Sequence, residues 1–189
     1  MGWALRAFLG FRPIYKLANL LTAVPFVVCG NSMRPALASN EYVLISRMSY
    51  LLNGPSRGDV VVLRNPWQPR TRYIKRIIGL PGEHVRVEGG LVFLDGLPLE
   101  EPYLDTGLSS AAGQDESPVS LDEGVSVEPH EHGKAPLTEW YLDEDEYFVL
   151  GDNRARSNDS RSFGPLHRSL IVGRSWVRYW PRSAWGFLY

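Results

Sequence analysis

"TRYIKRIIGL", residues 71–80, is the stretch that decides the fold. It combines a tyrosine with isoleucines, which favour buried strands, and "PGE" at 81–83 ends it with a turn. The β-branched run "GDVVVLRN" at 58–65 precedes it and follows a turn at "NGPSRGD". Further strand-like segments lie at 41–48, 84–99, 146–153 and 169–180, and 84–99 has the turns "EGG" and "DG" of a hairpin. The sequence therefore predicts a mostly β, antiparallel fold.

The composition limits the kind of protein. The 189 residues suffice for one well-cored domain with a smaller insertion. A net charge of −1 gives no reason to expect nucleic acid as a partner. The single cysteine, Cys29, excludes an intrachain disulfide and a cysteine-rich zinc site. The "HEH" at 130–132 lacks the helical spacing of zinc enzymes, so neither a metal nor a cofactor is predicted.

The first 23 residues are apolar but carry the basic residues Arg6, Arg12 and Lys16. The uncharged run 17–29 is shorter than the roughly 20 residues that a membrane-spanning helix requires. On a helix the basic residues gather on one face opposite an aromatic-rich face, which is typical of a helix at an anionic membrane surface or of a snorkelling anchor. We predict a membrane-associated helix over 1–23, with an ordinary helix packed on the domain as the alternative.

Two segments are predicted to lack regular structure. Residues 104–138 are acidic, rich in Ser, Gly and Pro, and show no periodicity, which indicates a long flexible loop. Residues 154–167 lie between the last two strands and have an irregular pattern.

Ser32 lies in "CGNSMRPAL" (29–37), directly after the apolar run "LTAVPFVV". A serine in a polar turn is usually a surface group, and it becomes a nucleophile only with a base in hydrogen-bond reach. His130 and His132 lie in the acidic loop, and neither His84 nor His167 has the sequence context of a catalytic triad. A base for Ser32 must therefore be sought among the lysines.

A lysine acts as a base only when its amine is neutral, and burial among apolar strands can lower its pKa by as much as ~3–5 units. Of the three lysines, Lys16 belongs to the N-terminal segment and Lys134 to the acidic loop. Only Lys75, in "RYIKRIIGL", is flanked by apolar strand residues. The alternative is that Lys75 points outward from an edge strand, as most strand lysines do.

Four boxes follow one another along the chain: "GNSMRPAL" (30–37), "RGDVVVL" (57–63), "YIKRIIGLPGE" (73–83) and "GDNRARSNDSRSFGPL" (151–166). Each alone is a short string, but in this order they resemble the successive boxes of type I signal peptidases. The resemblance covers roughly residues 24–104 and 139–181. It implies a serine endopeptidase that uses a serine–lysine dyad to remove signal peptides from exported preproteins, cleaving after small residues (Ala-x-Ala).

The resemblance assigns roles to residues around the serine. By motif position the nucleophile falls on Ser32 and the general base on Lys75. The backbone N–H of Ser32 would be the main oxyanion donor. Gly30 occupies the position at which many relatives carry a second donor serine, so the second donor is left open. Met33 would pack beside the nucleophile and line the substrate cleft.

The last box implies supporting roles. Ser157 falls on the serine that holds and orients the lysine amine. Asp159 and Arg161 fall on an aspartate and an arginine that pair behind the site. Asp152, the aspartate of "GDNR", would support the same region.

The resemblance also implies an organisation and a location. A β-rich catalytic core would comprise residues 24–85 and 144–189, with an inserted β cap at 86–143 that contains the acidic loop. Residues 1–23 would contact membrane lipids at a bacterial plasma membrane, with the catalytic part on the outer face. Signal-peptide-bearing preproteins would be the substrates, and the protein-export translocon a further partner.

Three other interpretations stay open at this point. An organelle inner-membrane peptidase belongs to the same family. A LexA-type self-cleaving protein shares the Ser/Lys dyad and a similar β fold, but it needs a DNA-binding domain ahead of the serine. A non-catalytic β-rich membrane-surface binding module would hydrolyse no peptide.

Overall fold

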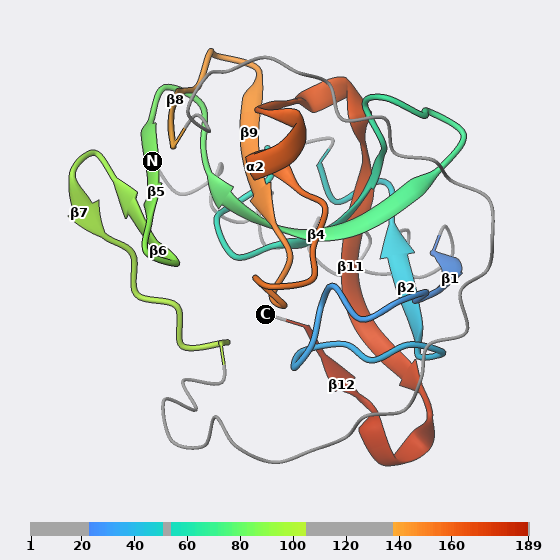
Figure 1. The fold of residues 1–189 in the computed structure, drawn as a ribbon. Coiled ribbons are helices and arrows are strands. Elements are labelled where there is room, and N and C mark those ends of the chain that lie inside the picture. Colours follow the sequence, from blue (N-terminus) through green and yellow to red (C-terminus); the bar gives the residue numbers. More distant parts are fainter. Residues whose placement is uncertain (1–22, 51–53, 105–137, 189) are drawn as a thin grey trace, which may run out of the picture.

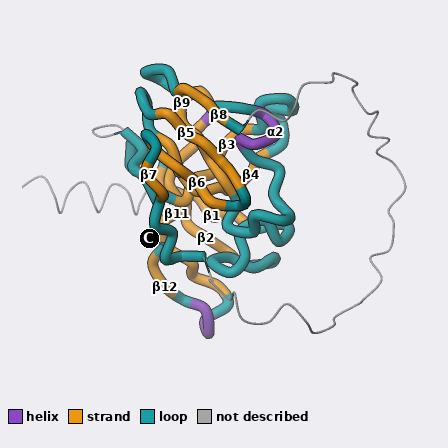
Figure 2. Tube along the Cα trace, turned by 60° about the vertical axis from the view of Figure 1, so that its left-hand side comes forward, coloured by secondary structure: helices purple, strands orange, loops and turns teal. Residues whose placement is uncertain are grey.

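The computed structural model describes residues 23–50, 54–104 and 138–188, and these fold into two antiparallel β-sheets (Figure 1). Strands form the body of the molecule, and the helices are short segments (Figure 2). The prediction of a mostly β, antiparallel fold is confirmed.

The larger sheet has the order β1-β2-β11-β3-β4-β9-β10, and β12 pairs with β11. Every pairing in it is antiparallel. The bounds are β1 Val24–Val27, β2 Tyr42–Ser46, β3 Val60–Arg64, β4 Arg72–Gly79, β9 Glu146–Leu150, β10 Leu166–His167, β11 Ile171–Trp180 and β12 Gly186–Phe187.

The smaller sheet has the order β7-β6-β5-β8 and is the structure of the segment inserted between β4 and β9. Its strands are β5 His84–Glu88, β6 Leu91–Leu94, β7 Leu97–Pro98 and β8 Glu139–Tyr141. The turns that join β5, β6 and β7 contain Gly89–Gly90 and Asp95–Gly96, all with positive φ. The hairpin predicted over 84–99 is therefore present. The predicted boundary at 85/86 falls inside β5, and the domain division stays a prediction.

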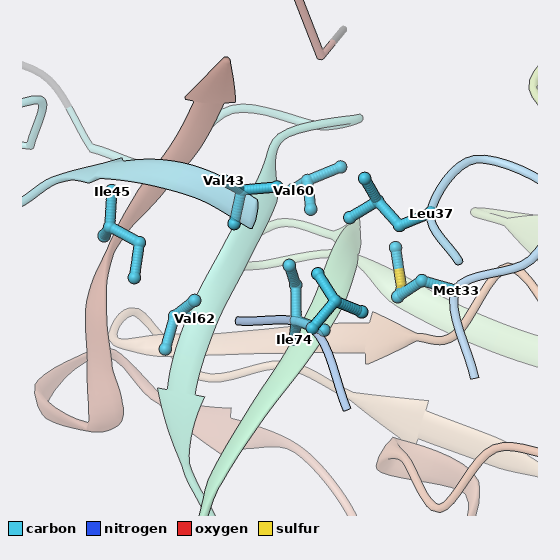
Figure 3. Packing of buried hydrophobic residues seen from close by; sticks show 8 residues of the cluster. Met33, Leu37, Val43, Ile45, Val60, Val62 and Ile74 are labelled. Atoms are coloured by element: carbon cyan, nitrogen blue, oxygen red, sulfur yellow. The ribbon is translucent and has the colours of Figure 1, made fainter. Parts of the chain in front are cut away.

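The core of the larger sheet is built from its β-branched strands. Four of the five residues of β3 are buried, because both faces of this central strand are covered. Met33 and Leu37, from the turn after β1, pack against side chains from β2, β3 and β4 (Figure 3). The turn that carries Ser32 is thus anchored in the core.

Several expectations need correction or fall outside the described residues. The predicted N-terminal helix covers residues 1–23, of which 1–22 lie outside, and the structure does not support it; residues 24–27 form strand β1. Among the described residues, no helix has the length and hydropathy needed to cross a bilayer. Most of the predicted loop 104–138 also lies outside. The segment 154–167 is not wholly irregular, because it contains the helix α2 (Ser160–Phe163) and β10.

Candidate active site

Ser32 lies half-buried in the turn after β1. The loop after β9 holds this turn by two hydrogen bonds from Asn153: its backbone N–H donates to the Ser32 carbonyl (3.0 Å), and its side-chain amide donates to the Asn31 carbonyl (3.1 Å). Below the turn, the Met33 side chain is fully buried. The serine is therefore fixed on both sides, by the core and by a neighbouring loop.

Lys75 projects from β4 toward the serine, and its side chain is buried. Its exposed fraction is 3%, so the alternative of an outward-pointing edge lysine is wrong. The Nζ atom donates to Ser32 Oγ (2.8 Å) and to the Ile74 carbonyl (3.0 Å). The structure thus brings together the two residues that the sequence singled out.

The surroundings of Lys75 lower the pKa of its amine. Burial disfavours the charged form and lowers the pKa from 10.5 to about 8, while the carboxylates of Asp159 and Asp152 act in the opposite direction. An amine with this pKa is neutral in a substantial fraction of molecules at mildly alkaline pH. In the neutral form, its lone pair can accept the proton of the Ser32 hydroxyl.

Asp152 pairs with an arginine next to the lysine. Its carboxylate accepts two hydrogen bonds from Arg76, from Nε (2.9 Å) and Nη2 (2.7 Å), and both side chains are almost completely buried. Arg76 also donates to the Gly58 carbonyl (2.8 Å). Because Arg76 follows Lys75 on β4, this ion pair ties the loop after β9 to the strand that carries the lysine.

Asp159 and Arg161 form the second predicted pair. Arg161 donates to the Asp159 carboxylate through Nε (2.9 Å) and Nη2 (3.0 Å), and the Gly151 N–H donates to the same carboxylate (3.0 Å). Burial alone would raise the pKa of Asp159, but these hydrogen bonds hold it below its ordinary value. Asp159 therefore stays charged and also caps α2.

Ser157 lies beside Gly151, close to the turn of Ser32. A Cβ atom added to Gly151 would lie 2.2 Å from Ser157 Oγ and 2.5 Å from the Ser32 carbonyl oxygen. The Ser157 hydroxyl is buried and lies within reach of the Asp159 carboxylate, whose pKa it helps to lower, whereas Lys75 Nζ donates to other groups. Its role in orienting the lysine stays a prediction.

The proposed oxyanion donors lie at the exposed side of the turn. Within the described residues the structure shows no acceptor for the Ser32 N–H, which leaves this group available to a ligand. The Gly30 N–H, in contrast, donates to Ser39 Oγ (3.3 Å). Gly30 has a positive φ of 85°, a conformation that glycine adopts readily.

A pocket of about 110 Å³ opens beside the dyad, lined by Phe26, Val27, Cys29, Ser32, Arg72, Tyr73, Ile74 and Lys75. Its two walls are β1, an edge strand, and the first part of β4. β9 pairs with β4 only at Arg76, Ile77 and Gly79. On that side of β4, residues 72–75 therefore have no strand partner and border the pocket. Met33 is not among the lining residues, and its fully buried side chain gives it a core position.

Sequence reasoning missed two residues that position the site, Arg76 and Asn153. Arg76 stands next to Lys75 in an apolar strand, and a buried guanidinium requires a carboxylate partner. Asn153 lies inside the "GDNR" box, so the box signalled its position but not its contact with the serine turn. Among the described residues, no group of His, Cys, Asp and Glu side chains could hold a metal ion.

Comparison with known proteins gives consistent results. Residues 3–180 match the family model described as signal peptidase, peptidase S26. A signal peptidase I from Leptolyngbya laminosa is 37% identical over 165 residues, covering 83% of this chain and 68% of that protein. A probable signal peptidase I-2 from Synechocystis is 36% identical over 164 residues, covering 84% and 63%. The chain therefore spans about two thirds of the length of these two relatives.

More complete coverage comes from a signal peptidase IB of Staphylococcus aureus, which is 30% identical over 181 residues, covering 96% of this chain and 90% of that protein. A crystal structure of a signal peptidase I from Enterococcus faecalis aligns with a TM-score of 0.44 and 28% identity, covering 65% of this chain and 97% of that one.

Proposed function

Because the chain belongs to the signal peptidase family, peptidase S26, we propose that Ser32 and Lys75 are its catalytic dyad. The family match confirms the resemblance predicted from the sequence, and the members of this family are serine endopeptidases. The observation that carries the proposal is the 2.8 Å hydrogen bond between Lys75 Nζ and Ser32 Oγ, made by a lysine whose pKa is lowered to about 8.

The proposed reaction begins when the neutral Lys75 amine takes the proton of Ser32 and the serine oxygen attacks the carbonyl carbon of the substrate. The Ser32 N–H would stabilise the oxyanion. The tetrahedral intermediate then collapses: the peptide C–N bond breaks, and the leaving amine takes the proton from the Lys75 ammonium. Lys75 next deprotonates a water molecule, which hydrolyses the ester and restores Ser32.

The substrate would bind in an extended conformation between the edges of β1 and β4. Free backbone groups on these edges suit a peptide that adds as a strand, a mode that tolerates varied sequences. The pocket beside Ser32, at about 110 Å³, suits small side chains near the scissile bond. These features support signal-peptide-bearing preproteins, cut after small residues, as the substrates.

The enzyme would act at a membrane. The basic, aromatic-rich sequence of residues 1–23 supports contact with anionic lipids, and the bacterial relatives support a location at the outer face of a bacterial plasma membrane, near the export translocon. An organelle inner-membrane peptidase is the second candidate, because it would have the same dyad. No observation in the described residues favours a LexA-type self-cleaving protein or a non-catalytic module.

Cleavage of synthetic peptides tests the dyad. Ser32→Ala should lower turnover of an Ala-x-Ala peptide by a factor on the order of 10³ or more, because the nucleophile is lost. Lys75→Arg should be as inactive, because a guanidinium stays protonated in this pH range. Ser162→Ala, an exposed serine on α2, is the matched control and should keep full turnover.

Circular dichroism must show that all three variants are folded. Substantial turnover by Lys75→Arg would exclude Lys75 as the base. Cleavage of a Phe-x-Phe peptide as fast as the Ala-x-Ala peptide would contradict the proposed substrate class while leaving the dyad intact.

A further inference from the structure

We propose that Tyr103 is a positioning residue for the dyad, because it links two buried ion pairs that hold the loop after β9 beside Lys75. The inference rests on the proposed function, in which Lys75 is the base and Ser32 the nucleophile. Tyr103 lies in residues 99–104, the described segment after β7, which we call the β7 extension. The four sequence boxes stop at residue 83 and resume at residue 151, so they assign this segment no role.

The β7 extension is anchored in the core that the two sheets share. The Leu99 N–H donates to the carbonyl of Val92 in β6 (2.8 Å). The Leu99 and Tyr103 side chains pack against a buried cluster that draws on both sheets: Ile78, Val85, Val92, Leu142, Phe148 and Leu150. Because β4 and β9 contribute to this cluster, Tyr103 has a fixed position relative to the strand that carries Lys75.

The Tyr103 ring covers the guanidinium of Arg76, and the guanidinium carbon lies 4.0 Å from the ring centre. The edges of this guanidinium are occupied by the Asp152 carboxylate (2.9 and 2.7 Å) and the Gly58 carbonyl (2.8 Å). A guanidinium donates in its own plane, so an aromatic ring can stack on its face without displacing these partners. The ring thus shields one face of the Arg76–Asp152 ion pair.

The Tyr103 hydroxyl reaches the second ion pair. It donates to the Glu101 carboxylate, which also pairs with Arg154, and both side chains of this pair are largely buried. Arg154 Nε donates in turn to the carbonyl of Gly151 (3.1 Å), the residue before Asp152. Burial and the hydrogen bond to Glu101 raise the pKa of Tyr103, so its hydroxyl stays protonated and remains a donor. One side chain therefore joins both ion pairs.

Both ion pairs end on the loop that fixes the serine. They hold Gly151 and Asp152, and the next residue, Asn153, donates to the Ser32 carbonyl (3.0 Å). Loss of the Tyr103 ring should therefore loosen the loop and the serine turn together. No residue of the β7 extension lines the pocket, so this loosening should lower kcat and leave KM largely unchanged.

The charge balance around Lys75 gives a second effect. Asp152 raises the pKa of Lys75 against the larger effect of burial, and Arg76 compensates part of the Asp152 charge. If Arg76 is loosened, the uncompensated carboxylate should raise the pKa of Lys75 further, toward its ordinary value. The other groups that face the amine are the Asp159 carboxylate, which pairs with Arg161, the Tyr73 ring and the Ser32 hydroxyl.

Steady-state kinetics of the full-length chain on an Ala-x-Ala peptide, from about pH 6 to about pH 10, test the inference. Tyr103→Leu removes the ring and should lower kcat at pH 7 about tenfold, with KM within about twofold, and move the pH–rate midpoint upward by about 0.5–1 unit. Tyr103→Phe keeps the ring on Arg76 and should restore kcat to within about threefold of the unmodified chain. Glu101→Gln weakens the second pair and should move the midpoint in the same direction by less.

Nuclear magnetic resonance of the lysines measures the same change without turnover. The chain has only three lysines, so ¹³C-labelled lysine gives few signals, and Lys75→Met identifies the signal of Lys75. The titration of Lys75 should move upward in Tyr103→Leu and stay in place in Tyr103→Phe. An unmodified chain that cleaves no Ala-x-Ala peptide would refute the proposed function, but this titration would still test the role of Tyr103.

Matched controls lie on the smaller sheet, where another tyrosine and another glutamate make similar contacts with different partners. Tyr141 is 76% exposed and stacks on His84, and the exposed Glu88 pairs with Arg86. Tyr141→Leu and Glu88→Gln should leave kcat within about twofold and the midpoint in place.

The inference is overturned if a folded Tyr103→Leu keeps the kcat and midpoint of the unmodified chain. It is overturned too if Tyr103→Leu loses turnover equally at every pH and the Lys75 titration does not move, which is the result expected of a merely structural residue. If Tyr103→Leu does not fold, Glu101→Gln decides, because an unshifted midpoint in that variant contradicts the link between the two ion pairs.

Discussion

Lys75 is the residue in which stability and chemistry oppose each other. Its amine lies in a buried strand, 2.8 Å from Ser32 Oγ, and burial lowers its pKa from 10.5 to about 8. The same burial that makes the amine a usable base makes its protonated form costly to accommodate in the folded state. Two measurable consequences follow, one for activity and one for stability.

Peptide turnover should rise with pH through about 8, because only the neutral Lys75 amine accepts the serine proton and its fraction increases across this pKa. The pH dependence of kcat/KM, which reports ionisations of the free enzyme, measures this pKa. A profile that instead titrates near pH ~6.5 and loses this step in a His→Gln variant would point to a histidine base.

Lys75→Met should stabilise the protein at pH 7 by about 1–3 kcal/mol. The folded pKa lies about 2.5 units below the ordinary 10.5, so the unfolded chain binds more protons between pH 8 and 10.5, and stability rises with pH across this window. The variant lacks this dependence, so its advantage in urea unfolding should shrink as pH approaches 10.5. Ser32→Ala serves as control, and a less stable Lys75→Met at pH 7 would contradict the buried-amine account.

At the scale of elements, the site depends on how the loop after β9 crosses the turn after β1. Gly151 is the point of closest approach, because a side chain there would meet Ser157 Oγ and the Ser32 carbonyl oxygen. The same loop contributes Asn153 to the turn and Asp152 to Arg76 of β4. Three separate contacts therefore set the distance between the serine and the lysine.

Gly151→Ala should reduce both stability and turnover. A Cβ at 2.2 and 2.5 Å from its neighbours forces the loop or the serine turn to move, which costs about 1–3 kcal/mol and separates Ser32 from Lys75. Gly186→Ala is the matched control, since nothing lies within 4 Å of the added atom. Thermal unfolding measures the loss of stability, and peptide turnover measures the loss of activity. A fully active Gly151→Ala would show that the close approach of Gly151 to the serine turn does not fix the position of Ser32.

The elements could be predicted where the sequence contains a local signal. The β-branched runs of β3 and β4 and the glycine turns of the 84–99 hairpin are such signals. The four-residue helix α2 is too short for a periodic pattern, although Asp159 and Gly164 cap it. The Arg76–Asp152 pair joins residues far apart in the sequence, and strand alternation alone could not identify the partner.

At the scale of the whole molecule, the smaller sheet packs on the larger one through a shared hydrophobic cluster, and the segment after β7 adds polar contacts near Lys75. Glu101 forms an ion pair with Arg154 of the loop after β9, and the Tyr103 ring stacks on the Arg76 guanidinium at 4.0 Å. The segment 105–137 then leaves from this point, outside the described residues, and the chain returns at Thr138, whose carbonyl accepts from Val87. The described chain on either side of residues 105–137 therefore lies at the smaller sheet or at the segment that links this sheet to the loop after β9.

Deletion of 106–134 should leave peptide turnover without lipid nearly unchanged. The described ends of this segment contact the smaller sheet and the loop after β9, and the dyad contacts are made without it. Turnover of the Ala-x-Ala peptide by the shortened chain, with and without anionic vesicles, measures its contribution. A large loss in the absence of lipid would mean that the deleted residues help to build the site.

The burial of Met33 has a consequence for how the enzyme would fail. Met33 follows Ser32, the proposed nucleophile, and packs against β2, β3 and β4, so the turn cannot open locally without exposing part of the core. Hydrogen exchange at this turn would therefore report global opening and not a local fluctuation. Loss of activity through opening of this turn should therefore accompany unfolding of the core.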